Sequence, residues 1–225
     1  MLRNKKRYNE IYIRTNISEK KDKNYGTIIE ELSNELNYEA SKKATDKKIE
    51  KDNNHIYFYS EVDRESIYDL IVLINETELE NIVTSIKLHI EEIPIYLHIN
   101  SCGGSIFEAL NIIDVIEACK VPVYTIIEGA TASAGTLISV VGKKRFMRPN
   151  AYMLIHELRS TFWGKMSEIE DECKNLKDIM QRIKTIYTKH SAIPKKELNE
   201  LLKHDLWLNI DKCIQYKLID ELWQK

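Results

Sequence analysis

Short β-prone apolar runs alternate along this chain with segments in which apolar residues recur at helical spacing. Residues 94–99 and 121–127 are typical of strands, because β-branched and aromatic side chains dominate them. Between them, Ser105 and Glu108 form a capping box that predicts the start of a helix. This alternation constrains the chain to an α/β fold with a largely parallel sheet. We expect strands at residues 56–59, 94–99, 121–127, 145–147 and 152–155, and helices at residues 67–90, 106–116, 136–141, 167–187 and 194–202 and after Asn209.

Three later positions predict where helices begin. Ser167 and Glu170 form a capping box ahead of the longest amphipathic pattern, whose apolar residues recur at steps of three and four. Pro194 is favourable at the first position of a short helix, and Asn209 is a good cap for the last one. The helix that begins at Ser167 is the best-defined element of the sequence.

Residues 1–54 differ in composition from residues 55–225. They are rich in Lys, Glu and Asn and contain no Pro, Phe, Trp or Cys. A segment of this kind buries little apolar surface, so we predict a charged, flexible N-terminal extension before a globular domain. Inside the extension, Thr27 and Glu30 form a capping box that favours one short helix. A gate, a propeptide and a docking arm are alternative roles for it.

The charge and the cysteines exclude several classes of function. The formal net charge of -2 provides no general basic field, so we predict no nucleic-acid partner. The apolar runs are too short to span a bilayer, and no apolar signal sequence follows the first residues, so we expect no membrane segment. The four cysteines lack C-x-x-C spacing, which indicates reduced thiols in a cytoplasmic protein. We predict neither a metal nor a cofactor, because zinc spacings and the nucleotide-binding glycine motifs are both missing.

Ser133 stands between a predicted strand and a predicted helix, within the small residues 131–135. A serine at such a turn exposes its hydroxyl beside the unpaired backbone N–H groups of the first helical turn. These donors favour negative charge, which is what the oxyanion of an acyl transfer carries. Small residues also let a helix pack closely on a sheet, and for this segment alone packing is the better interpretation.

A serine nucleophile also requires a base and a group that orients the base. His156 ends an apolar strand, where parallel sheets place groups that face a ligand. Asp205 lies between two predicted helices, where an aspartate is usually a cap or turn residue. The pair Gly103 and Gly104 follows a strand, so its backbone can approach a ligand closely and supply a second N–H donor. Each of these signals is weak by itself.

Four segments, in this order, resemble the proteolytic subunit family of the Clp proteases. The resemblance covers residues 55–222. The separation between Gly104 and Ser133 and that between His156 and Asp205 also agree with the family. Four ordered segments are far more specific than one, and they favour a catalytic Ser133 over a packing role. The segments are residues 99–105 (glycine-rich), 129–135 (nucleophile), 144–156 (histidine) and 205–220 (aspartate and closing helix).

The resemblance implies a serine endopeptidase with the catalytic triad Ser133, His156 and Asp205. It implies an oxyanion hole built from the backbone N–H groups of Gly104 and Ala134. It also implies a ClpP-like, crotonase-type α/β fold of repeated ββα units, with the longest helix as a protruding handle. The family forms two stacked heptameric rings, a tetradecamer, which a Clp-type ATP-dependent unfoldase supplies with polypeptide. Further copies of the chain, an unfoldase and unfolded polypeptides are therefore the expected partners.

The sequence departs from the family in four places. Cys102 stands where the family usually has proline, and His98 where an aromatic residue is usual on the strand surface that helps to dock the unfoldase. Glu157 and Leu158 replace the usual Gln-Pro after the histidine, and the N-terminal extension exceeds the usual axial loop. These differences concern the unfoldase, the gating and the ring geometry. The last two suit a divergent, phage-type member.

Three other interpretations stay open. A crotonase-like acyl-CoA hydratase or isomerase would share the fold and the paired N–H donors without needing Ser133. A catalytically silent ring subunit would keep the triad unused. A Ser-Lys dyad enzyme of the signal-peptide-peptidase type could use Lys143 or Lys144, although we see no membrane anchor. The ordered serine, histidine and aspartate favour the peptidase.

Overall fold

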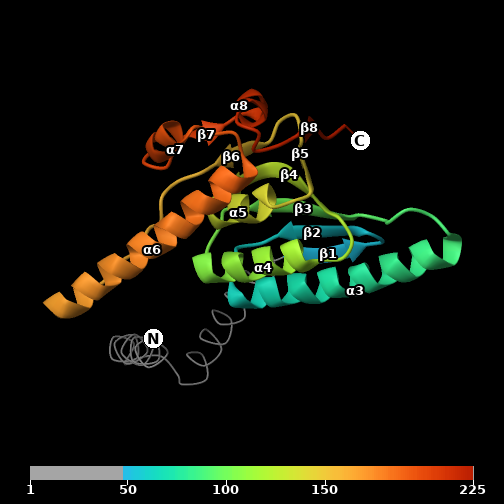
Figure 1. Cartoon of the computed structure of the whole chain (residues 1–225), viewed down its shortest axis with the longest axis horizontal. Helices are drawn as coiled ribbons and strands as arrows, with labels where there is room; N and C mark the ends of the chain where they lie inside the picture. Colours follow the sequence, from blue (N-terminus) through green and yellow to red (C-terminus); the bar gives the residue numbers. More distant parts are fainter. Residues whose placement is uncertain (1–47, 225) are drawn as a thin grey trace, which may run out of the picture. The chain divides into compact units, whose positions relative to one another are not determined.

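Eight strands form one sheet in the part of the chain that the computed structural model describes, residues 48–224 (Figure 1). The neighbours β2, β3, β4 and β5 run parallel, and β8 continues the sheet in parallel beside β5. The strand β1 is antiparallel to β2 at the opposite edge, while β6 pairs in parallel with the end of β4 and antiparallel with β7. The predicted α/β fold with a largely parallel sheet is therefore confirmed. The strands are β1 Lys48–Asp52, β2 His55–Tyr59, β3 Ile95–Ser101, β4 Val123–Ala132, β5 Lys144–Met147, β6 Tyr152–Leu154, β7 Trp207–Leu208 and β8 Glu221–Leu222.

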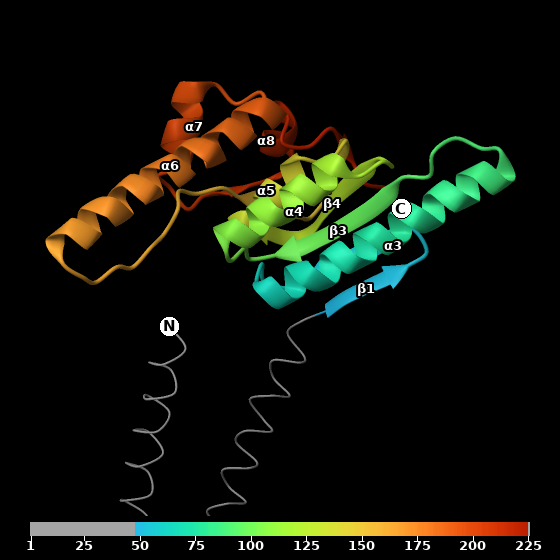
Figure 2. The same cartoon turned by 60° about the horizontal axis from the view of Figure 1, so that its bottom comes forward.

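Six described helices surround this sheet, and each predicted helix of residues 55–225 is present. Figure 2 shows α3, α4 and α5 side by side over one face of the sheet. The long helix α6 runs past the edge of the sheet, and α7 and α8 follow it (Figure 1). The helices are α3 Arg64–Leu88, α4 Ile106–Ala118, α5 Ala134–Val140, α6 Met166–His190, α7 Lys195–Leu201 and α8 Ile210–Gln215.

The strand pattern explains where the core lies. In β2, Ile56 and Phe58 are fully buried, while Tyr57 and Tyr59 alternate with them and are half-buried. This period of two places one set of side chains against the helices and the other on the opposite face of the sheet. The helix-facing set packs against apolar residues of α3, α4 and α5 in one continuous core. The opposite face carries aromatic rings, among them Tyr57, Tyr96, Tyr124, Phe146 and Trp223.

The two halves of α6 have different surroundings. Its C-terminal half buries Ile183, Ile186 and Tyr187 against the core. Its N-terminal half extends beyond the sheet (Figure 1), and both Met166 and Ile169 are exposed there. The helix therefore has the form of a protruding handle, as the sequence predicted.

Three predicted boundaries were wrong. The sheet begins at Lys48 rather than at residue 55, because β1 pairs with β2 along its whole length. The helix α6 begins before Ser167, and Glu168 caps it by accepting the Lys165 backbone N–H at 2.9 Å. Pro194 is the residue that precedes α7, not its first helical residue. The short helix predicted near Thr27 lies outside the described residues.

Candidate active site

Ser133 is the single residue between β4 and α5, and its backbone has an unusual conformation. Its φ is 53° and its ψ is -126°, a region that costs a non-glycine residue about 1–3 kcal/mol. Hydrogen bonds hold both sides of the turn: the Ser133 N–H donates to the Leu154 carbonyl at 2.9 Å, and its carbonyl accepts the Thr136 N–H at 3.0 Å. Such a sharp turn from strand to helix presents the hydroxyl beside the free N–H groups of α5.

The glycine pair packs against this turn so closely that no side chain fits. Gly103 and Gly104 have φ angles of 95° and 146°. A Cβ on Gly103 would lie 2.6 Å from the Cβ of Ser133, and one on Gly104 would lie 2.4 Å from the Val62 carbonyl oxygen. Glycine is therefore required at both positions by conformation and by space.

Val62 fixes the direction of the Gly104 amide. The Val62 N–H donates to the Gly103 carbonyl at 2.8 Å, and the Ser105 N–H donates to the Val62 carbonyl at 2.7 Å. Val62 and Gly104 form a parallel bridge, in which Val62 bonds to the residues before and after Gly104 and not to Gly104 itself. The Gly104 N–H therefore points away from Val62. Neither this N–H nor that of Ala134 donates to an acceptor within residues 48–224. Both residues line the pocket described next.

A pocket of about 250 Å³ contains both Ser133 and His156. His156 follows β6, and its Nδ1 lies 2.6 Å from the Glu157 carbonyl oxygen. No hydrogen bond joins the serine and histidine side chains in the described structure, and catalytic bonds are often loose before substrate binds. The pocket wall combines apolar side chains with polar groups, as ligand-binding pockets commonly do. The other lining residues include Cys102, Ile106, Leu137, Leu158, Arg159, Ile183 and Tyr187.

Asp205, the predicted acid of the triad, lies between α7 and β7 and does not line this pocket. Its carboxylate forms an ion pair with Arg159, which does line it. The Glu157 N–H donates to the Leu202 carbonyl at 2.7 Å, so the histidine loop and the end of α7 are adjacent. The structure thus gathers four of the five predicted site residues in one pocket and leaves Asp205 beside it.

A buried polar network that the sequence did not reveal crosses the aromatic face of the sheet. His98, 2% exposed, lies 2.9 Å from His55 and 3.0 Å from Glu128. The Glu128 carboxylate also accepts hydrogen bonds from Arg148, at 2.8 Å, and from Tyr59. Burial would raise the pKa of Glu128, but these bonds bring it below its ordinary value. His55 is half-buried in this network, because its partners His98 and Tyr96 come from the neighbouring strand β3.

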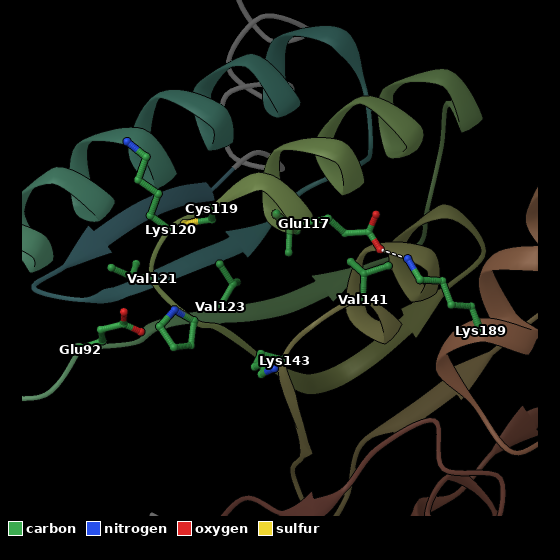
Figure 3. A pocket seen from close by; sticks show the side chains of 11 residues that line it. Glu92, Glu117, Cys119, Lys120, Val121, Val123, Val141, Lys143 and Lys189 are labelled. Carbon is green, nitrogen blue, oxygen red and sulfur yellow. Dashed lines mark hydrogen bonds and ion pairs between the residues drawn. The ribbon is translucent and has the colours of Figure 1, made fainter.

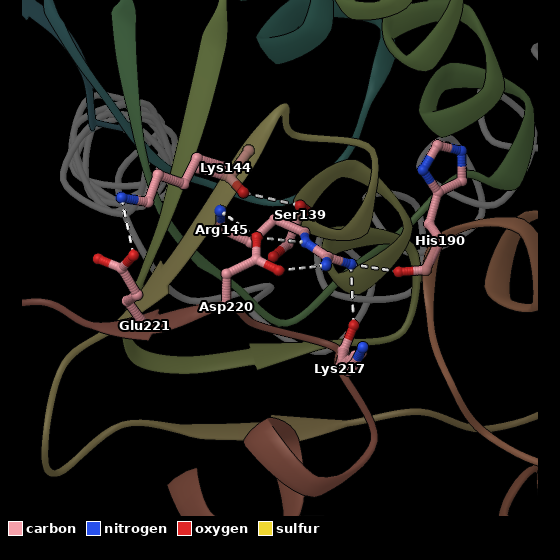
Figure 4. Close-up of polar contacts among 8 residues, drawn as sticks. Ser139, Lys144, Arg145, His190, Lys217, Asp220 and Glu221 are labelled. Carbon is pink, nitrogen blue, oxygen red and sulfur yellow. Dashed lines mark hydrogen bonds and ion pairs between the residues drawn. The ribbon is translucent and has the colours of Figure 1, made fainter.

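The two lysines of the Ser-Lys alternative lie elsewhere. Lys143 lines a separate pocket of about 600 Å³, shown in Figure 3, together with Glu117 and Lys189, whose side chains pair at 2.7 Å. Lys144 pairs with Glu221 at 2.8 Å (Figure 4). Neither lysine lines the Ser133 pocket, so this geometry does not support a Ser-Lys dyad. Among the described helices, none is long and apolar enough to cross a membrane.

Known proteins resemble this chain over much of its length. A model of the Clp protease family matches residues 50–225. The chain is 34% identical over 131 residues to ATP-dependent Clp protease proteolytic subunit 2 of Treponema denticola, which covers 57% of this chain and 66% of the relative. It is 32% identical over 134 residues to the protein of the same name from Treponema pallidum, covering 59% and 67%. The matched region thus spans about two thirds of the length of these relatives.

Proposed function

The chain belongs to the Clp protease family, and we propose that it is a serine endopeptidase, the proteolytic subunit of a Clp-type protease. The observation that carries this proposal is the pocket in which Ser133 and His156 meet two backbone N–H donors without acceptors. An acyl-transfer site needs these parts: a nucleophile, a base and a hole for the oxyanion.

In this mechanism the Ser133 Oγ attacks the scissile carbonyl carbon while His156 takes the hydroxyl proton. His156 then gives the proton to the leaving amine, and a water molecule hydrolyses the acyl-enzyme by the same steps in reverse. Asp205 fixes the imidazole tautomer once its carboxylate reaches His156. In the structure the His156 Nδ1 faces the Glu157 carbonyl and Asp205 pairs with Arg159, so both groups change partner when the triad forms.

The N–H groups of Gly104 and Ala134 would stabilise the oxyanion of the tetrahedral intermediate. They come from two different loops, and the backbone of each is fixed by its own contacts. Val62 holds the glycine loop, and the turn at Ser133 holds the first residue of α5. Donors that are already oriented need no reorganisation in the transition state, which is why such a hole accelerates acyl transfer.

We further propose that copies of the chain assemble into stacked rings, heptameric in the family pattern, that receive unfolded polypeptide from a Clp-type ATP-dependent unfoldase. The large apolar residues at the free end of the handle support assembly. Trp163 is 95% exposed and Met166 is 70% exposed, with Phe162 and Ile169 beside them in the sequence. A cytoplasmic location suits the four free cysteines.

A serine-directed fluorophosphonate probe tests the function directly. We expect one probe adduct by intact-mass measurement, cleavage of short fluorogenic peptides, and loss of both in Ser133→Ala. Ser139→Ala is the matched control, because Ser139 is a buried serine of α5 outside the pocket. A wild-type protein that is neither labelled nor active would refute the peptidase and favour a silent subunit or a crotonase-like enzyme.

A further inference from the structure

Two buried hydroxyl groups form a chain that ends on the carbonyl of the nucleophile. The Thr136 Oγ1 lies 2.6 Å from the Ser133 carbonyl oxygen and 2.6 Å from the Tyr187 hydroxyl. Thr136 belongs to α5 and is fully buried, while Tyr187 comes from the buried half of α6 and is 1% exposed. The chain therefore connects the handle helix to the backbone at Ser133.

The direction of both hydrogen bonds follows from the chemistry. A carbonyl oxygen only accepts, so the single hydroxyl proton of Thr136 goes to the Ser133 carbonyl. The Tyr187 hydroxyl must then be the donor to Thr136. Burial raises the pKa of the Tyr187 phenol well above its ordinary value, which keeps that proton in place.

The Ser133 carbonyl belongs to the same planar peptide unit as the Ala134 N–H. In a trans peptide the two groups point in opposite directions, so holding the carbonyl also sets the direction of the N–H. Gly103 closes the other side of this unit, since a Cβ there would lie 3.0 Å from the Ala134 nitrogen. A flip of the peptide would leave the buried Thr136 hydroxyl without its acceptor.

From this geometry we infer that Thr136 and Tyr187 are positioning residues of the active site: together they hold the Ser133–Ala134 peptide so that the Ala134 N–H faces the substrate carbonyl. The inference rests on the proposed function. It assigns the buried half of α6 a task at the oxyanion hole, besides packing. The Thr136 backbone N–H also donates to this carbonyl, at 3.0 Å, and the hydroxyl chain adds a second bond at a turn whose positive φ a serine does not prefer.

Substitutions that remove single hydroxyl groups test the inference. Thr136→Val should lower kcat for a fluorogenic peptide by at least about tenfold, up to the 10²–10³ that follows loss of one oxyanion donor. KM should change by less than about twofold, because the donor acts mainly in the transition state. Thr136→Ser keeps the hydroxyl and should restore kcat to within about threefold. Tyr187→Phe leaves the Thr136 bond to Ser133 intact and should lower kcat less than Thr136→Val does.

Thr125 provides the matched control. Its buried hydroxyl donates to the Ser139 carbonyl at 2.7 Å, so Thr125→Val removes the same kind of bond from the same helix, away from the nucleophile. We expect Thr125→Val to keep the wild-type kcat. The inference fails if Thr136→Val keeps its kcat, if Thr136→Ser is as impaired as Thr136→Val, or if Thr125→Val loses as much.

A crystal structure of Thr136→Val separates this inference from the proposed function. We expect a rotated Ser133–Ala134 peptide in the variant, whether or not the wild-type protein cleaves peptides. An unchanged peptide plane would overturn the positioning role even in an active enzyme. If Thr136→Val does not fold, Tyr187→Phe is used instead for the kinetics and for the crystal structure. A wild-type kcat and an unchanged peptide plane in Tyr187→Phe would overturn the role of Tyr187.

Discussion

The lack of a side chain at Gly104 allows its backbone to pack closely against Val62 in the site. A Cβ there would meet the Val62 carbonyl oxygen at 2.4 Å, and backbone cannot move aside as a flexible side chain can. We predict that Gly104→Ala lowers kcat by about 10²–10³ by displacing the N–H donor. Gly164→Ala is the control, because its Cβ would meet chiefly the flexible Glu168 carboxylate and the Phe162 ring. Kinetics of peptide cleavage test this prediction. A normal kcat in Gly104→Ala would show that Gly104 is not part of the oxyanion hole.

His98 makes the stability of the fold depend on pH. Burial lowers the pKa of His98, and the Glu128 carboxylate, which acts in the opposite direction, does not compensate fully. His55 and Arg148 also act to lower it. The unfolded chain therefore binds a proton near the ordinary value of about 6.5, while the folded chain binds it only at lower pH. As far as His98 determines it, the free energy of unfolding is highest above about pH 6.5 and decreases as the pH falls below that value.

Urea unfolding at pH 7.5 and pH 5.5 tests this prediction. The wild-type protein should be less stable at pH 5.5, and His98→Gln should lose part of that difference. The pKa of His190 is also lowered, by burial and by Lys189, so His190→Gln should remove a further part. Equal stability of the wild-type protein at the two pH values would contradict the predicted direction.

The sequence predicted which residues would lie together better than it predicted their contacts. Ser133, His156 and Gly104 meet because parallel strands bring their C-terminal ends to one edge, which a pattern of strands and helices already implies. The pairing of Asp205 with Arg159 could not be predicted, since it depends on how two loops approach each other. The catalytic roles of Ser133, His156 and Asp205 all stay predictions.

At the level of the elements, Arg145 fastens the end of the chain to β5. Its guanidinium donates to Asp220 at 2.5 and 2.9 Å, to the Lys217 carbonyl at 2.9 Å and to the His190 carbonyl (Figure 4). The Arg145 side chain is only 13% exposed. Although burial would raise the pKa of Asp220, the hydrogen bonds from Arg145 bring it below its ordinary value. One side chain thus links β5, the end of α6 and the segment after α8.

We predict that Arg145→Met lowers the free energy of unfolding by about 2 kcal/mol. This value is below the 3–5 kcal/mol of a fully buried pair, because Asp220 is 34% exposed and solvent screens it. The neighbouring pair Lys144–Glu221 is the control: its side chains are 40% and 56% exposed, so Lys144→Met should cost less than about 1 kcal/mol. Urea unfolding measures the loss of stability in Arg145→Met and in Lys144→Met. Equal losses would contradict the role of Arg145 in fastening the segment after α8 to β5.

The element boundaries were predicted less well than the elements. The strand β1 reads Lys-Ile-Glu-Lys-Asp and has a single apolar residue, Ile49, packed against the core. Such an edge strand resembles a charged tail in composition, so only its pairing with β2 identifies it. The sequence pattern places the apolar residues of α6 on one stripe. In the fold the two ends of this stripe differ, because Ile183 is buried in the core whereas Ile169 is exposed on the N-terminal half of the helix.

For the whole molecule, the free end of the handle is the surface that we expect to contact a second copy of the chain. Trp163 and Met166 are large, apolar and exposed, which is unfavourable unless a partner covers them. We predict that the double variant Trp163→Ser, Met166→Ser forms smaller assemblies than the wild-type protein in light scattering. Tyr68→Ser on α3, where the tyrosine is 67% exposed, is the control. A monomeric wild-type protein would refute ring assembly, and a fully assembled double variant would refute this contact.

The boundary at β1 determines how the role of the N-terminal extension can be tested. Deleting residues 2–46 leaves β1 and the sheet complete, whereas deleting residues 2–53 removes β1 and exposes the edge of β2. We therefore expect the shorter deletion to unfold at the same urea concentration as the full chain, and the longer one to be less stable. Any comparison of activity should use the shorter deletion, because loss of an edge strand would disturb the sheet that positions Ser133.

The variant that lacks residues 2–46 can show whether the extension selects substrates, because its sheet and its active site stay complete. In the proposed ring the peptidase sites lie inside a chamber, so a segment that guards the entrance would exclude long chains more than dipeptides. The extension is charged and carries both signs, which suits such a guard without requiring a fixed partner. We predict that deleting residues 2–46 raises cleavage of casein more than cleavage of a fluorogenic dipeptide. Equal changes for the two substrates would exclude a gate, and an intact mass that already lacks the first ~50 residues in the active wild-type protein would identify a propeptide instead.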